Sequence, residues 1–456
     1  MKPRQKRTRD ILIFQLVEND RAIIHLLSLK INLFTKKQTT KYKASFKYNN
    51  SSVLDGLFLI KNLIFVIIKS NELMSRMVNT PVISIDEVIR PTRVEVDLKI
   101  LAENFANIKN YVKHAGMMPI LKANAYGHGL VRIAKLMQCL KADYIGVAVL
   151  EEGILLRESG IDIPILVLGG IWGNQIPHFI KNNLSITASS IAKLNQIEEI
   201  AGQMKSKAKV HLKIDTGMER IGVHYYTAEK FLETAVSCKN IQIDGIYSHL
   251  ANSELKDLSY TRLQLERFQE VNRFFEKHSL EFPLRHIANS GAILQMPDSF
   301  LDMVRPGIML YGVYPSTDTE KTIPVNPALS WKSLIVYFKV IKAGHPIGYG
   351  STWKPDHDIR AVTVPVGYGD GYLRSMSHKA EVLIRGQRYP AVGTISMDQI
   401  VINIENGSAY NGDEVILLGS KDGNSITCED LAGWAGTIPY EILTNINTRV
   451  PRVYIE

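Results

Sequence analysis

Short apolar runs that alternate with amphipathic segments dominate the middle of this 456-residue chain. Eight such runs, many of them rich in Val and Ile, are Met118–Ala123, Tyr144–Leu150, Ile163–Leu168, Leu184–Ala188, Lys209–Asp215, Ile243–His249, Leu284–Ala288 and Met303–Arg305. The segments between them have helical spacing, for example Gly129–Leu140, Ser190–Lys205 and Tyr260–His278. Eight strand–helix units predict an α/β fold, an eight-stranded parallel (β/α)8 barrel. An open doubly wound sheet has the same periodicity and stays an alternative.

The pattern changes near Lys321, where strands and turns replace the strand–helix units. Further strands are expected at Leu334–Ile341, Ala361–Pro365, Glu381–Ile384, Ile400–Ile404 and Asp413–Leu418, with one helix at Cys428–Ala435. We therefore expect the barrel domain at residues 80–322 and a smaller, mainly β C-terminal domain at residues 323–456.

The net charge of +9 comes from the first 79 residues, which hold 15 basic and 5 acidic side chains. The remainder holds 39 basic and 40 acidic residues, so the body of the protein needs no nucleic-acid partner. The apolar run Val53–Ile68 is too short and too polar for a membrane helix. Residues 1–79 are expected to be a poorly ordered extension, or to precede a true start at Met74 or Met77. A targeting or membrane-associating segment and a binding arm are the alternatives.

Polar residues gather where the predicted barrel strands end, and this edge carries the active site in such barrels. Lys122 ends the first strand, His249 the sixth and Arg305 the eighth, while Ser290 and Gly307 follow the seventh and eighth. Each of these residues alone is more often structural, since a lysine can extend its ammonium to the surface. Together, a desolvated lysine, arginines and a backbone phosphate site predict pyridoxal 5'-phosphate bound as a Schiff base.

At these residues the sequence resembles alanine racemase, from about Arg93 to Glu456. The most specific motif is Leu121–Gly129, which matches the cofactor-lysine motif of the family. Distant motifs agree with it: Lys213–Val223, His286–Ser290, Met303–Gly307, Gly348–Thr352, Gly367–Tyr372, Thr394–Gln399 and Thr437–Glu441.

The resemblance implies two catalytic bases, Lys122 on the D-alanine face and Tyr349 on the L-alanine face. In the family, the tyrosine reaches the cofactor from the partner subunit. Arg220 and the backbone N–H of Met397 resemble the groups that bind the substrate carboxylate. The implied cofactor-binding residues are Lys122, Tyr126, Arg220, His249, Asn289, Ser290, Arg305, Gly307, Ile308 and Tyr440.

Two further residue roles follow from the resemblance. Arg305 matches the arginine that faces the pyridine nitrogen, and Tyr349, His249 and Arg305 match a hydrogen-bonded chain of the family. An arginine is always charged and disfavours protonation of the ring. Lys213 matches a position that is carbamylated in some members, and the sequence leaves its state open.

The expected function is therefore that of a cytoplasmic, homodimeric isomerase that interconverts L- and D-alanine and supplies D-alanine for peptidoglycan of the bacterial cell wall. Cys139, Cys238 and Cys428 are widely spaced, which fits a reducing compartment. No metal, nucleic acid or membrane partner is expected for the enzyme body. A racemase with a broader amino-acid range is the alternative. A pyridoxal-phosphate decarboxylase of related fold is disfavoured, since it would place an acidic residue where Arg305 stands.

Overall fold

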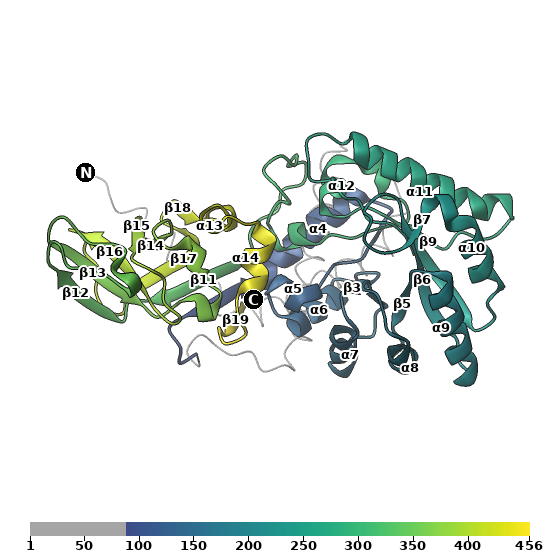
Figure 1. Ribbon diagram of the computed structural model, residues 1–456, viewed down its shortest axis with the longest axis horizontal. Helices are drawn as coiled ribbons and strands as arrows, with labels where there is room; N and C mark the ends of the chain where they lie inside the picture. Colours follow the sequence, from purple (N-terminus) through teal and green to yellow (C-terminus); the bar gives the residue numbers. More distant parts are fainter. Residues whose placement is uncertain (1–87) are drawn as a thin grey trace, which may run out of the picture. The chain divides into compact units, whose positions relative to one another are not determined.

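The computed structural model describes residues 88–456, in which helix-covered parallel strands are followed by a second, larger sheet (Figure 1). The predictions for residues 1–79 lie outside this described part. Within it, no helix combines the length and apolar character that crossing a membrane requires.

The parallel sheet contains six strands in sequence order, and a short strand, β7 (Val223–His224), pairs with β6. The six are β3 (Ile145–Val147), β4 (Ile165–Val167), β5 (Ser185–Ala188), β6 (Ala208–Asp215), β8 (Ile241–Tyr247) and β9 (Leu284–His286). A separate parallel pair joins β2 (Gly116–Met117) to β10 (Met303–Val304). Backbone hydrogen bonds connect the two sets, since Leu121 donates to Gly146 and Arg305 donates to Ala288.

The prediction of the first strand, Met118–Ala123, is wrong in its placement, because the observed strand ends before Met118. Strand β2 stops at Met117, and Lys122 begins the short helix α5 (Lys122–Tyr126). Pro119 has no N–H for a strand ladder, so residues 118–121 make only separate backbone bonds to their neighbours. The other seven barrel strands lie at the predicted places with shifted ends.

Helices lie along the outside of these strands, as Figure 1 shows for α7 to α11. Their bounds are α4 (Leu98–Val112), α6 (Leu130–Cys139), α7 (Leu150–Glu158), α8 (Ile176–Lys181), α9 (Ile191–Gln203), α10 (Ala228–Ser237), α11 (Ser259–Lys277) and α12 (Ser290–Gln295). Helix α4 begins where Asp97 accepts the Ile100 N–H at 2.9 Å. Helix α11 buries Phe268 and Phe275 on one face, which gives it the amphipathic spacing that the sequence shows.

The second sheet contains the remaining strands in the order β12-β13-β16-β15-β14-β17-β11-β1-β19, with β18 beside β17. Their bounds are β1 (Arg93–Asp97), β11 (Leu329–Leu334), β12 (Tyr337–Ile341), β13 (Ile359–Val364), β14 (Glu381–Ile384), β15 (Gln387–Val392), β16 (Ile400–Glu405), β17 (Glu414–Lys421), β18 (Asn424–Ile426) and β19 (Arg452–Ile455). Two helices, α13 (Cys428–Ala435) and α14 (Pro439–Asn445), lie between β18 and β19 in the sequence. The prediction of one strand over Leu334–Ile341 is wrong. This segment contains the last residue of β11 and, after a break at residues 335–336, the whole of β12.

Both ends of the described chain belong to this second sheet. Strand β1 pairs antiparallel with β11 and parallel with β19, although it precedes the barrel strands in sequence. The segment after Lys122 also meets the C-terminal part, because Arg452 Nε donates to the Gly127 carbonyl at 3.0 Å. A Cβ on Gly127 would lie 2.2 Å from the Leu443 carbonyl oxygen, so only glycine allows this close approach.

Candidate active site

Ten of the twelve predicted site residues line one pocket at the carboxyl ends of the barrel strands. They are Lys122, Tyr126, Arg220, His249, Asn289, Ser290, Arg305, Gly307, Ile308 and Tyr440. The pocket also contains Lys213, Tyr247 and Glu254. Tyr349 and Met397 do not line it.

Lys122 stands at the start of a left-handed turn. Ala123, Asn124, Ala125 and Tyr126 all have positive φ, and L-residues rarely adopt this conformation. Glu152 stabilises the turn, because its carboxylate accepts the N–H of Ala123 at 2.7 Å and that of Ala148 at 2.9 Å. The unusual backbone therefore directs the Lys122 side chain into the pocket from a fixed base.

The surroundings of Lys122 shift the pKa of its amine downward. Burial among protein atoms lowers the pKa of Lys122, the nearby Arg220 lowers it further, and Glu152 opposes the shift. A lysine whose pKa lies below its ordinary value is a better nucleophile and a better proton acceptor near neutral pH.

Hydroxyl and backbone N–H groups gather around Ser290 and Gly307 in the same pocket. The Gly307 N–H donates to Ser290 Oγ at 2.9 Å, and Asn289 Oδ1 accepts from Ser253 Oγ at 2.6 Å. A Cβ on Gly307 would lie only 2.9 Å from Tyr126 Oη, so glycine keeps this part of the pocket open. Burial raises the pKa values of Tyr126 and Tyr440, so both phenols remain hydrogen-bond donors. Hydroxyls and backbone N–H groups of this kind suit a phosphate group.

Arg305 is buried in the wall of the pocket and contacts two histidines, one of which contacts a third. Its guanidinium approaches Nδ1 of His286 at 2.9 Å and Nδ1 of His249 at 3.2 Å, and it donates to the Ser248 carbonyl at 2.8 Å. Because arginine can only donate, both Nδ1 atoms must accept. His286 then carries its proton on Nε2 and donates to Nδ1 of His211 at 2.9 Å. Burial first, and Arg305 second, lower the pKa of each of these histidines, so all three stay neutral.

Arg220 is placed by the turn that follows β6. Asp215 Oδ1 accepts the N–H groups of Gly217 and Met218 at 2.9 Å, and its Oδ2 accepts the Arg220 N–H at 3.2 Å. Burial alone would raise the pKa of Asp215, but these backbone bonds lower it below its ordinary value. Lys213, on the same strand, is buried with its Nζ 4.4 Å from the Tyr247 ring centre. Burial and the charge of Arg305 lower the pKa of Lys213 well below its ordinary value.

Tyr349 and Met397 lie on the surface of the C-terminal β part, where they are 72% and 50% exposed. Their loops are neighbours, because Thr394 Oγ1 donates to the Tyr349 carbonyl at 3.0 Å. Within one subunit, the predicted hydrogen-bonded series of Tyr349, His249 and Arg305 therefore contains only its last link, between His249 and Arg305.

Three residues that shape the site, His211, His286 and Glu152, were not predicted as site residues. A signal for His211 exists, because it is two residues before Lys213 on β6 and successive odd positions of a strand share a face. Glu152 has no comparable signal, since its role depends on where the chain brings Ala123.

Known proteins are similar to this chain in sequence and in fold. The family model "Alanine racemase, N-terminal domain" matches residues 96–315, and "Alanine racemase, C-terminal domain" matches residues 328–454. Alanine racemase 2 of Caldanaerobacter subterraneus subsp. tengcongensis is 42% identical over 370 residues, which cover 80% of this chain and 95% of the relative. A solved alanine racemase of Clostridium difficile 630 is 38% identical with a TM-score of 0.77, and the match covers 81% of this chain and 97% of that one. A solved histidine racemase of Leuconostoc mesenteroides subsp. sake is 28% identical with a TM-score of 0.74, covering 81% and 99%.

Proposed function

The chain belongs to the alanine racemase family, a family of pyridoxal-phosphate-dependent isomerases, and from this premise we propose that Lys122 and Tyr349 exchange the Cα proton of alanine on opposite faces. The observation that carries the proposal is the pocket in which Lys122, Arg220, Arg305 and the Ser290–Gly307 anion site converge. An alanine-sized amino acid and one cofactor account for all of these groups.

The residues of the pocket fit pyridoxal 5'-phosphate. Lys122 would hold it covalently, Ser290, Gly307, Ile308, Tyr126 and Tyr440 would hold its phosphate, and Asn289 and His249 lie beside it. Arg305 is buried and fixed by four hydrogen bonds, so it would supply a permanently charged donor for the ring nitrogen of the cofactor. When bound, the cofactor withdraws electrons from Cα of the amino acid and makes its proton removable.

Racemisation needs one proton-carrying group on each face of the substrate carbon. On one face Lys122 takes or returns a proton at Nζ, and its lowered pKa suits this task. On the other face Tyr349 does the same at its phenol oxygen. Arg220 and the backbone N–H of Met397 hold the substrate carboxylate, so that the same carbon faces both groups.

The second base comes from a partner subunit in this proposal. Tyr349 and Met397 are exposed, lie on neighbouring loops and are missing from the pocket of their own chain. A homodimer that places these loops over the pocket of the other copy completes both sites at once. Arg220, which lines the pocket, is itself exposed.

Hybrid dimers test this assignment. A Lys122→Ala subunit and a Tyr349→Phe subunit each form inactive homodimers, but their hybrid contains one site with both bases intact. After subunit exchange in an equal mixture, about a quarter of wild-type activity should return, because half the dimers carry one of two sites. If no activity returns although hybrids form, Tyr349 does not act across the interface.

Several finer features belong to the same proposal. The eight strands form a closed barrel, which the backbone bonds of residues 118–121 and Arg305 to neighbouring strands support. The barrel domain spans residues 80–322 and the β domain 323–456, with β1 contributed to the second sheet by the first segment.

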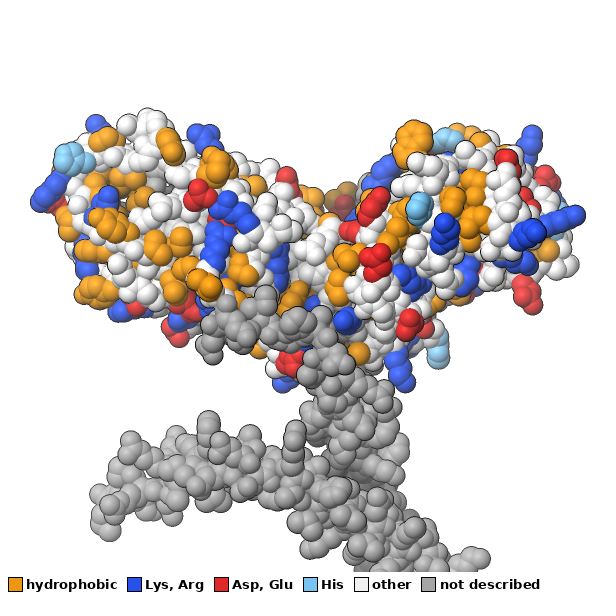
Figure 2. Space-filling view, turned by 90° about the horizontal axis from the view of Figure 1, so that it is seen from below, with side chains coloured by type: hydrophobic (Ala, Val, Ile, Leu, Met, Phe, Trp, Pro, Cys, Tyr) orange, Lys and Arg blue, Asp and Glu red, His pale blue; other side chains and the backbone are white. Residues whose placement is uncertain are grey.

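We also propose a cytoplasmic enzyme that supplies D-alanine for peptidoglycan. Figure 2 shows side chains of both charges spread over the described surface on that face, which fits an enzyme body without a nucleic-acid partner.

The decisive experiment is racemisation of a panel of L-amino acids with added pyridoxal phosphate. We expect alanine to be the preferred substrate, and Lys122→Ala to lose both turnover and the visible absorbance of the bound cofactor. Normal turnover by Lys122→Ala would overturn the assignment. The panel includes histidine because a histidine racemase shares this fold at 28% identity. A flat preference across the panel would favour the broader racemase, and release of carbon dioxide would favour the decarboxylase.

A further inference from the structure

Asp370 is a fully buried carboxylate outside the pocket, at the end of the short 3-10 helix η7 (Tyr368–Asp370). Its Oδ2 accepts the Gly367 N–H at 3.0 Å. Its Oδ1 lies 2.7 Å from Arg90 Nη2 and 2.7 Å from Arg449 Nε. The carboxylate therefore has three hydrogen-bond donors, two of them positively charged.

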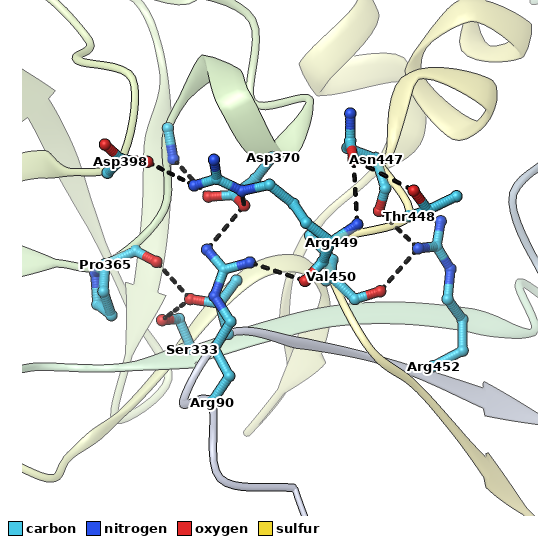
Figure 3. Close-up of polar contacts among 12 residues, drawn as sticks. Arg90, Ser333, Pro365, Asp370, Asp398, Asn447, Thr448, Arg449, Val450 and Arg452 are labelled. Carbon is cyan, nitrogen blue, oxygen red and sulfur yellow. Dashed lines mark hydrogen bonds and ion pairs between the residues drawn. The ribbon is translucent and has the colours of Figure 1, made fainter.

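The two arginines come from near the two ends of the described chain, and Figure 3 shows both of them beside Asp370. Arg90 also donates to the Arg449 carbonyl at 3.1 Å. Arg449 Nη2 continues outward to Asp398 Oδ1 at 2.5 Å. The two arginines and two aspartates have equal and opposite charge, so no buried charge in the group lacks an opposite partner.

Asp398 follows Met397, so the charged group reaches the loop that carries the proposed carboxylate donor. We call residues 367–371 and 394–398 the paired loops. They are joined directly, because Tyr368 donates to the Ser396 carbonyl at 3.0 Å and Gly369 donates to the Met397 carbonyl at 2.9 Å. A Cβ on Gly369 would lie 2.8 Å from Arg449 Nη1 and 3.0 Å from the Met397 carbonyl oxygen. The two loops are therefore packed too closely for a side chain at position 369.

We propose that Asp370 is a positioning residue for substrate binding, which holds the paired loops so that the Met397 N–H meets the substrate carboxylate in the partner subunit's site. This inference rests on the proposed function. Asp370 touches neither substrate nor cofactor. Its effect on the substrate is indirect. Asp370 fixes η7 through Gly367, and it fixes the Met397 loop through Arg449 and Asp398.

The charge of Asp370 is the part that matters for this role. In Asp370→Asn, the side chain keeps its shape, but it loses the charge that attracts both guanidinium groups, and charge-assisted bonds are the strong ones. Arg90 and Arg449 are 29% and 40% exposed in their side chains, so water can solvate them in the variant. The variant should therefore fold while its paired loops lose their fixed position.

The test compares Asp370→Asn with Asp358→Asn in the full-length enzyme saturated with cofactor. Asp358 is the control, because it lies just before β13 and pairs with Lys342 at 2.6 Å and with the Ala343 N–H at 3.0 Å, neither of which belongs to the paired loops. We expect Asp370→Asn to raise KM for alanine about tenfold and to change kcat less than about threefold, because an interaction of equal strength in the ground and transition states acts on KM. Asp358→Asn should change neither constant.

Two inhibitors identify which substrate group is affected. Propionate is alanine without its amino group, and ethylamine is alanine without its carboxylate. In Asp370→Asn the inhibition constant of propionate should rise by about the same factor as KM, while that of ethylamine stays as in the wild type. A general structural defect would weaken both inhibitors equally.

The outcomes separate this inference from the proposed function. A wild-type enzyme that does not racemise alanine overturns the proposed function. A wild-type enzyme that does, together with unchanged KM and propionate binding in Asp370→Asn, overturns the positioning role alone, as does equal weakening of both inhibitors. If Asp370→Asn does not fold, Asp398→Asn decides instead, because that side chain is 63% exposed and its replacement removes only the outer ion pair. It should raise KM and the propionate constant about threefold, and unchanged values refute the inference.

Discussion

Replacing Glu152 with glutamine should loosen the segment that carries Lys122. In that segment Ala123–Tyr126 have φ values of 54°, 56°, 53° and 50°. A left-handed conformation costs an L-residue about 1–2 kcal/mol, so the four residues together cost about 4–8 kcal/mol. Surrounding contacts must offset this cost. Glu152 supplies the first of them, because its Oε1 accepts the Ala123 N–H at 2.7 Å.

The size of the effect follows from the two short hydrogen bonds that Glu152 accepts, beside a longer one from the Val149 N–H at 3.4 Å. Its second oxygen accepts the Ala148 N–H at 2.9 Å. Glutamine has one carbonyl oxygen and can satisfy only one of the two N–H groups, while its own NH2 faces the other. Loss of one hydrogen bond to a charged acceptor costs about 1.5–3 kcal/mol. If the full cost falls on the conformation that binds pyridoxal phosphate, the dissociation constant rises about 10- to 150-fold.

The assay is a spectroscopic titration of the cofactor-free enzyme with pyridoxal phosphate. Glu151→Gln is the matched control, because Glu151 is the exposed neighbour on the same turn of α7 and its change alters the charge equally. We expect the control to bind the cofactor as the wild type does. Equal dissociation constants for Glu152→Gln and Glu151→Gln would refute the view that this carboxylate holds the left-handed segment.

Two further predictions concern the second base and the response to pH. Tyr349→Phe should slow solvent exchange at Cα of L-alanine more than at Cα of D-alanine, as measured by deuterium incorporation, and equal losses would contradict the two-base division. Burial lowers the pKa of His128 from 6.5 to about 4. The unfolded chain therefore binds more protons between these values, so the free energy of unfolding should fall as the pH falls through this window, by about 3 kcal/mol from this side chain. Denaturant titrations should show a shallower fall for His128→Asn, whose amide N–H can replace the Nδ1–H that faces the Tyr126 carbonyl.

The sequence predicted the ends of those elements that are fixed by residues adjacent to them in the chain. The helix Cys428–Ala435 has its predicted bounds, because Thr427 and Asp430 cap its start reciprocally at 3.0 and 2.9 Å. Strand β15 was not predicted, since Arg388 and Pro390 interrupt the apolar alternation there. Its pairing with β14 and β16 forms the strand nevertheless, and such partners are distant in the sequence.

The sequence by itself determined the chemical types and their order along the chain. Repeating strand–helix units predicted polar residues such as Lys122, His249 and Arg305 at strand ends, and parallel strands bring those ends to one edge. The family resemblance predicted the others, such as Tyr440, and ten of the twelve predicted residues share a pocket. Only the tertiary structure decided that Tyr349 and Met397 face outward, that Lys122 rests on a left-handed turn, and that positions 90, 370 and 449 meet around one buried carboxylate. Periodicity reports which side of a single element is buried, whereas these arrangements depend on how elements far apart in the chain pack together.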